Sequence, residues 1–92
     1  MAITAVIKRI LDTKTVGANG FETRELHVTT EEQYAQTLAI QFNQGKVSLL
    51  DNFKPGQKVK IEFNLKGREW TNPQGELVIF NTIEGWKIEE VV

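Results

Sequence analysis

The stretch QKVKIEFNLKGR, residues 57–68, alternates between polar and apolar side chains from Lys58 to Lys66. Its apolar positions are Val59, Ile61, Phe63 and Leu65. Successive side chains of a β-strand point to opposite faces of the sheet, so this pattern predicts a strand with one face on a core and one face in water.

The segments that follow continue the β pattern. Residues 72–75, Asn-Pro-Gln-Gly, have turn chemistry, because proline presets φ and glycine accepts the conformation that closes a turn. Residues 77–83 then form the last long strand, and Gly85-Trp86 kinks the chain before residues 87–89. A small barrel needs sharp coiling, and Gly67 and Gly85 are placed where they can supply it.

The N-terminal third of the chain predicts a hairpin. Residues 3–11 are rich in β-branched side chains, and their apolar positions fall on both faces, which indicates a strand that bends or is covered on both sides. Turn signals follow at Gly17 and at Asn19-Gly20. Residues 21–30 then alternate, with Leu26 and Val28 on one face and Phe21, Thr23, Glu25 and His27 on the other.

Residues 30–42 fit two patterns. Thr30 and Gln33 resemble a capping box, and Tyr34, Leu38 and Phe42 have helical spacing. Leu38, Ile40 and Phe42 also alternate as a strand would, so the pattern leaves helix and strand open. A short helix follows, which Asn43 can cap, with an apolar stripe of Val47, Leu49, Leu50 and Phe53.

The resulting order is two strands, an uncertain third, a short helix and two more strands. We therefore expect an all-β domain over residues 1–92, a five-stranded Greek-key OB-fold barrel with one short helix between strands three and four.

The composition of the chain limits the classes of function that it can have. The chain has 92 residues, no cysteine, one histidine, 11 basic and 12 acidic residues, and a net charge of −1. We expect no metal, no cofactor and no catalysis, because His27 and Ser48 stand alone and no glycine-rich phosphate loop precedes a helix. With no signal-peptide pattern or membrane span, a cytoplasmic protein is expected.

The segments VIKRIL, GANGFETREL, LAIQF, FKPGQKVKIEFNLKGREW and WKIEE together resemble a family of short bacterial OB-fold proteins of unknown function, similar to single-stranded DNA-binding proteins. The most telling parts lie at residues 55–59, 67–70 and 86–88. The resemblance implies that residues 36–42 form a strand. It also implies binding of single-stranded nucleic acid, and a homodimer.

The candidate binding residues follow from the OB-fold, which binds ligands on strands two and three and the flanking loops. Exposed aromatic rings can stack on bases without reading sequence, and cations beside them can meet phosphates. The aromatic candidates are Phe21, Trp70 and Phe80, and the basic candidates are Lys14, Arg24, Lys66 and Arg68. Each ring also has a structural interpretation, as a lid, a barrel-end cover or an oligomer contact, whereas Phe42, Phe53, Phe63 and Trp86 are expected in the core.

Two functions remain open. The first is non-specific binding of single-stranded DNA or RNA by stacking and a local basic rim. The second is an OB-fold protein-interaction or assembly module that buries the same aromatic residues at a protein interface. The near-neutral charge favours the second function, since phosphate binders usually carry a basic excess. The resemblance to single-stranded DNA-binding proteins favours the first, which is therefore our main expectation.

Overall fold

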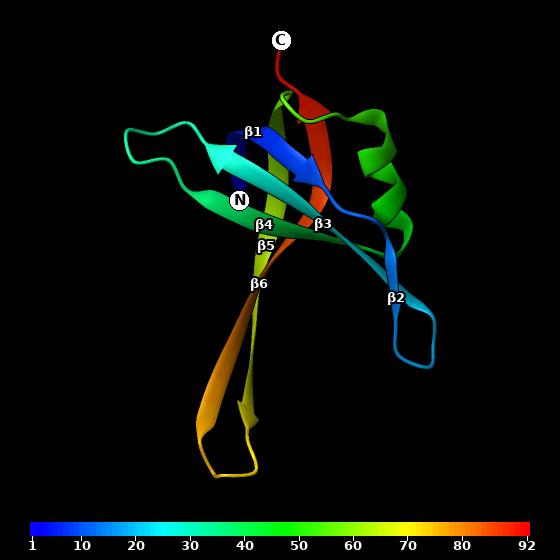
Figure 1. Cartoon of the computed structure of the whole chain (residues 1–92), viewed down its shortest axis with the longest axis vertical. Coiled ribbons are helices and arrows are strands. Elements are labelled where there is room, and N and C mark those ends of the chain that lie inside the picture. Colours follow the sequence, from blue (N-terminus) through cyan, green and yellow to red (C-terminus); the bar gives the residue numbers. More distant parts are fainter.

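Six β-strands and one short helix make up the chain in a computed structural model that describes residues 1–92 (Figure 1). The elements are β1 (Ala2–Ile10), β2 (Lys14–Val16), β3 (Phe21–Thr30), β4 (Thr37–Asn43), the 3₁₀ helix η1 (Gln44–Asn52), β5 (Lys58–Thr71) and β6 (Leu77–Glu90). Strand β4 confirms the strand that the family resemblance implied for residues 36–42. No helix has the length and apolar character needed to cross a membrane.

The sheet has the strand order β1-β5-β6-β4-β3-β2, and five of these strands close into a ring because β1 also pairs with β3; β2 pairs only with β3, outside the ring. All pairings are antiparallel except β4 with β6, which is a short parallel seam. The register of β1 against β3 shifts between Ile7 and Arg9, which is the bend expected in this strand. The ring and the helix after β4 confirm the OB-fold, with the first hairpin extended by the short strand β2.

The core lies inside this ring. Strand alternation supplies its buried side chains, and Phe42 is the largest of them. The buried apolar residues are Ala5, Ile7, Leu26, Val28, Ile40, Phe42, Leu50, Val59 and Ile61. Leu50 comes from η1, so the helix covers one end of the barrel, and Phe53 packs against the core from just beyond it.

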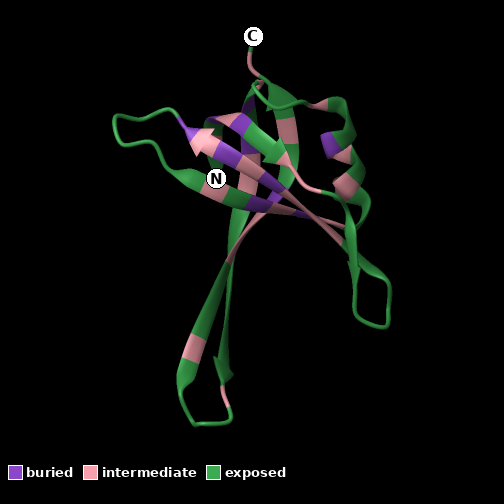
Figure 2. Cartoon of the chain, viewed as in Figure 1, coloured by how far each residue is buried: buried purple, intermediate pink, exposed green.

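Beyond the barrel, β5 and β6 continue as a long two-stranded extension, which we call the arm (residues 64–82) (Figure 1). Pairing of β1 with β5 ends at Glu62, and β4 pairs with β6 only at Ile83 and Glu84. The arm tip is the predicted turn, in which Asn72 Oδ1 accepts hydrogen bonds from the amides of Gln74 and Glu76 and Gly75 adopts a φ of 82°. Core burial is confined to the barrel, and the arm is almost entirely exposed (Figure 2).

Three apolar positions differ from the sequence expectation. Leu65 is 62% exposed because β5 has already left the barrel at that point. Phe63 is only half-buried for the same reason. Trp86 is 41% exposed because the β5–β6 register skips it, pairing Gly85 with Phe63 and Lys87 with Glu62. This bulge turns Gly85 inward and Trp86 outward, although alternation from the half-buried Ile88 would place Trp86 inside.

The bulge brings the backbone of Gly85 against the ring of Phe42. A Cβ atom on Gly85 would lie 2.5 Å from Cζ of Phe42, a distance that ordinary packing does not allow. The closure of the barrel therefore requires a residue without a side chain at position 85.

We predict that Gly85→Ala lowers the free energy of unfolding by about 1–3 kcal/mol, because Phe42 must leave its packed position. Urea unfolding followed by circular dichroism measures this change. Gly45→Ala is the matched control, since a Cβ there meets nothing within 4 Å, and it should leave stability unchanged or slightly raised. Equal effects of both substitutions would contradict the packing constraint.

Candidate functional site

The arm has two chemically different faces. Antiparallel pairing places Arg68 opposite Phe80, Trp70 opposite Val78 and Lys66 opposite Thr82, so these six side chains share one face, which we call the aromatic face. The intervening residues form the aliphatic face, which carries Leu65, Glu69, Leu77, Ile79 and Asn81. The candidate site lies on the aromatic face.

Trp70, Phe80 and Arg68 form a cluster on that face. The ring centroids of Trp70 and Phe80 lie 6.3 Å apart with planes inclined at 45°. The guanidinium carbon of Arg68 lies 5.8 Å from the centroid of the Phe80 ring, within the range of a cation–π contact. The exposed fractions of Trp70 and Phe80 are 51% and 46%, so about half of each side chain can meet a ligand. These three residues and Glu69 line a hollow of about 390 Å³.

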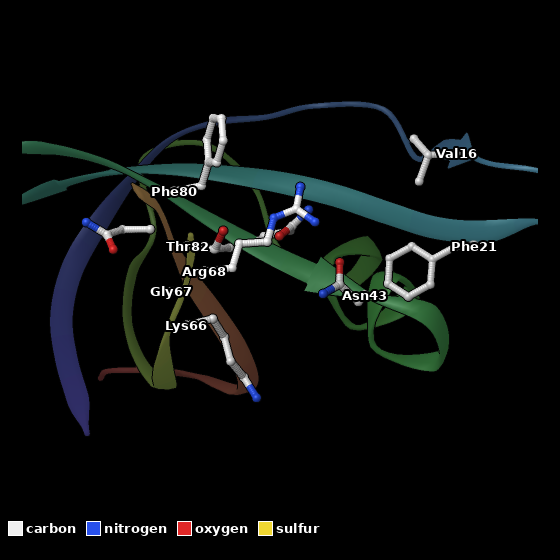
Figure 3. A pocket seen from close by; sticks show the side chains of 10 residues that line it. Val16, Phe21, Asn43, Lys66, Gly67, Arg68, Phe80 and Thr82 are labelled. Carbon is white, nitrogen blue, oxygen red and sulfur yellow. The ribbon is translucent and has the colours of Figure 1, made fainter. Parts of the chain in front are cut away.

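A larger groove of about 600 Å³ runs from this cluster to the barrel (Figure 3). Phe80 and Arg68 stand toward one end of the groove, and Phe21 and Val16 stand at the other. Lys66 and Thr82 lie beside Arg68 and Phe80, and Asn43, from the end of β4, lies between this group and Phe21. The groove therefore joins the arm to the start of β3, which brings together candidate residues that are about 60 positions apart in the sequence.

The groove lining between the aromatic ends is polar. Gln41 Nε2 donates a hydrogen bond to Thr23 Oγ1 at 2.7 Å, and Asn43 Nδ2 donates to Glu84 Oε2 at 2.9 Å. The single oxygen of the same side-chain amide, Asn43 Oδ1, is buried and has no hydrogen-bond partner. The sequence interpretation missed Gln41, Asn43 and Thr82 as groove residues. For Gln41 and Asn43 the signal was a polar residue next to the core residues Ile40 and Phe42. Asn43 was interpreted as a helix cap, but its side chain makes no capping hydrogen bond.

The positive charge of the groove is partly offset by a neighbouring carboxylate. Lys66 Nζ lies 3.8 Å from Glu84 Oε1. Both Lys66 and Arg68 remain solvent-exposed. The site therefore has solvent-exposed cations at its rim and no strongly positive field, in keeping with the net charge of −1.

The predicted residues divide between this site and the barrel wall. Phe21, Lys66, Arg68 and Phe80 line the groove, and Trp70 lines the adjoining hollow. Lys14 is exposed on β2 and lies beside a separate small hollow that also contacts Arg24. The structure thus brings together all three aromatic candidates and two of the four basic ones.

Arg24 does not join the groove. Its Nε donates a hydrogen bond to the carbonyl of Leu11 at 2.8 Å, and Nη1 donates to the carbonyl of Val47 at 3.3 Å and to Asp51 Oδ1 at 2.8 Å. The side chain is 16% exposed. Because these partners occupy the guanidinium, Arg24 ties η1 and the β1–β2 turn to β3, and we leave it out of the phosphate contacts expected from the sequence.

Comparison with known proteins assigns this chain to a family. The family model described as "Domain of unknown function (DUF3127)" matches residues 2–89, and the chain belongs to that family. No curated protein matches the sequence. Among solved structures, the chain is similar to Rim1, a mitochondrial single-stranded DNA binding protein from S. cerevisiae, with a TM-score of 0.74. The two are 15% identical, and the similarity covers 99% of this chain and 92% of Rim1, so it supports the OB-fold over the whole length.

We predict that Arg24→Met lowers the free energy of unfolding by about 1–3 kcal/mol, because two backbone carbonyls lose a charged donor. Chemical unfolding measures the loss. Asp51→Asn is the control: Asp51 is 67% exposed, so weakening this surface ion pair should cost less than about 1 kcal/mol. A change as small for Arg24→Met as for Asp51→Asn would show that the guanidinium is not a structural tie.

Proposed function

We propose that the chain binds single-stranded nucleic acid, DNA in the first instance, through the aromatic face of the arm and the groove at its base. The observation that carries this proposal is the arrangement of Trp70, Phe80 and Phe21 along one continuous surface, with Arg68 and Lys66 beside them. A binding role is proposed rather than a catalytic one.

Stacking supplies most of the binding energy in this proposal. Each exposed ring offers a flat apolar surface to one base, and stacking contributes about 1–3 kcal/mol per base whatever its sequence. Bases of a duplex are already stacked inside the helix, so only a single strand can present its bases in this way. The site therefore selects single strands by geometry and does not read sequence.

Phosphate contacts contribute less of the binding energy than stacking does in this proposal. Arg68 and Lys66 reach the groove, and Lys14 can extend the cationic rim from β2. An arginine pairs with phosphate through parallel N–H donors and also stacks on a base, so Arg68 fits both roles. The carboxylate of Glu84 reduces the local potential, which limits electrostatic affinity.

The fold supports the proposal by analogy. OB-folds bind oligonucleotides on this side of the barrel, and Rim1, which shares the fold, is described as a single-stranded DNA binding protein. RNA is the related ligand that the same stacking geometry accepts. The homodimer that the resemblance implies and the cytoplasmic location stay predictions.

A protein-interaction module is the second candidate function. The net charge of −1 and the exposed apolar side chains Leu65, Leu77 and Ile79 favour it. An aliphatic surface offers a nucleic acid neither an aromatic ring for stacking nor a cation for its phosphates. The sequence had suggested that such a module would bury the aromatic residues, whereas the exposed aliphatic side chains lie on the opposite face of the arm. Substitutions on each face therefore show which of them a partner uses.

We predict that Trp70→Ala or Phe80→Ala raises the Kd for a thymidine oligonucleotide by about 5- to 150-fold, the loss of one stacking contact. Fluorescence anisotropy of a labelled oligonucleotide at low salt measures the Kd. Tyr34→Ala is the matched control, because Tyr34 is 75% exposed on the β3–β4 loop, outside the groove. Unchanged affinity in both arm variants would overturn the stacking site.

The salt dependence of this binding should be shallow. If Arg68 and Lys66 each neutralise one phosphate, log Kobs falls against log[salt] with a slope of about −1.4. Titrations at a series of NaCl concentrations give the slope, and Lys66→Gln should reduce its magnitude by about 0.7. A slope several times steeper would mean that a different, more basic surface holds the strand.

A further inference from the structure

A second hollow, which we call the side hollow, lies beside the groove where β3 and β4 run across the base of the arm (Figure 1). Its volume is about 400 Å³, within the range of small-molecule sites. It shares Gln41, Asn81 and Thr82 with the groove, so the two adjoin. Its other lining residues come from the barrel wall and the base of the arm: Glu25, Ala39, Leu65 and Ile83.

The side hollow combines apolar walls with a polar edge. Ala39, Leu65 and Ile83 offer apolar contacts to the faces of a flat ring. Glu25 and Gln41 are direct cross-strand neighbours on β3 and β4, so their polar ends lie side by side at the barrel wall. Apolar walls with a few placed polar groups are typical of sites that bind one small ring system.

A chain of hydrogen bonds orients the Glu25 carboxylate. Arg9 Nη1 lies 3.0 Å from His27 Nδ1, and His27 Nε2 lies 2.9 Å from Glu25 Oε1. Because arginine carries only donors, Nδ1 accepts from Arg9, and the ring hydrogen is on Nε2, which donates to Glu25. Oε1 is therefore engaged with His27, and Oε2 is left to accept a hydrogen bond from a ligand.

The polar edge of the side hollow is rich in acceptors. Gln41 Nε2 already donates to Thr23 Oγ1, which leaves the Gln41 amide oxygen as an acceptor beside the Glu25 carboxylate. No lysine or arginine lines the hollow. It therefore suits a ligand edge that presents N–H donors, and it disfavours a carbonyl oxygen or a phosphate at the same position.

We propose that the side hollow binds one base of the bound strand that carries an amino group where thymine and uracil carry a carbonyl oxygen, namely cytosine or adenine. The amino group donates to Glu25, while Asn81 and Thr82 can donate to the ring nitrogen beside it. This inference rests on the proposed function, because it needs a strand in the groove. Stacking on the arm does not distinguish bases, so the preference arises in the side hollow alone.

Oligodeoxycytidine and oligodeoxyuridine of equal length test this proposal. They share ring size, sugar and phosphates and differ only at the edge of the base. Fluorescence anisotropy at one salt concentration should give a Kd at least about fivefold lower for the cytidine oligonucleotide, the discrimination of one base-edge contact.

Glu25→Gln should abolish or reverse this preference. His27 Nε2 keeps the amide oxygen of the new side chain, so its NH₂ group faces the hollow and suits the carbonyl oxygen of uracil. Glu32→Gln is the matched control, because it removes the same charge from the β3–β4 loop, outside the groove and the side hollow. It should keep the ratio of the two Kd values.

Ala39→Leu narrows the side hollow without touching Glu25 and should also abolish the preference. Glu25 and Ala39 are both exposed on the barrel wall, so each variant should keep the parent circular dichroism spectrum. Equal Kd values for the two oligonucleotides in the parent would overturn the side hollow and leave the stacking site standing. A preference that persists in both variants would also overturn it. Absence of binding by either oligonucleotide would overturn the proposed function and the side hollow together.

Discussion

The contact between the Phe42 ring and the backbone of Gly85 is the constraint on which this structure depends. It lies at the end of the short parallel seam between β4 and β6, where the pairs Ile40–Ile83 and Gln41–Glu84 close the ring. On one side of this seam the strands enclose the core, and on the other side β5 and β6 leave the barrel as the arm. One close approach therefore completes the barrel and fixes the point from which the arm projects.

Alternate residues of the arm point to two opposite faces, and both faces are exposed. Residues of even number from Lys66 to Trp70 and from Val78 to Thr82 carry the rings and cations, and residues of odd number carry leucine and isoleucine. In a barrel strand, one of these sets would be buried. Because the arm has no core beneath it, both faces stay exposed, and binding of a single strand on the aromatic face would leave the aliphatic face free.

Local sequence patterns predicted the barrel well, because alternation and turn chemistry act over a few residues. They placed residues 58–62, Leu26 and Val28 correctly, and they predicted the turn at residues 72–75. They failed at Phe63, Leu65 and Trp86, since nothing local indicates where a continuous strand leaves its core or skips a residue. The aromatic candidates and their grouping followed from fold-level reasoning. The partners of Arg24 and the polar lining at Gln41 and Asn43 depend on contacts distant in sequence, which alternation cannot show.

The two tryptophans provide the most direct test of the central claim, that single strands bind on the aromatic face of the arm. Trp70 lies in the site and Trp86 lies at the bulge, outside both hollows that form it. A ¹H–¹⁵N NMR titration with a thymidine oligonucleotide follows their indole N–H signals separately, after assignment with Trp86→Phe. The account predicts that the Trp70 signal shifts and saturates while the Trp86 signal stays in place. A static Trp70 signal, or a shift confined to Trp86, would contradict it.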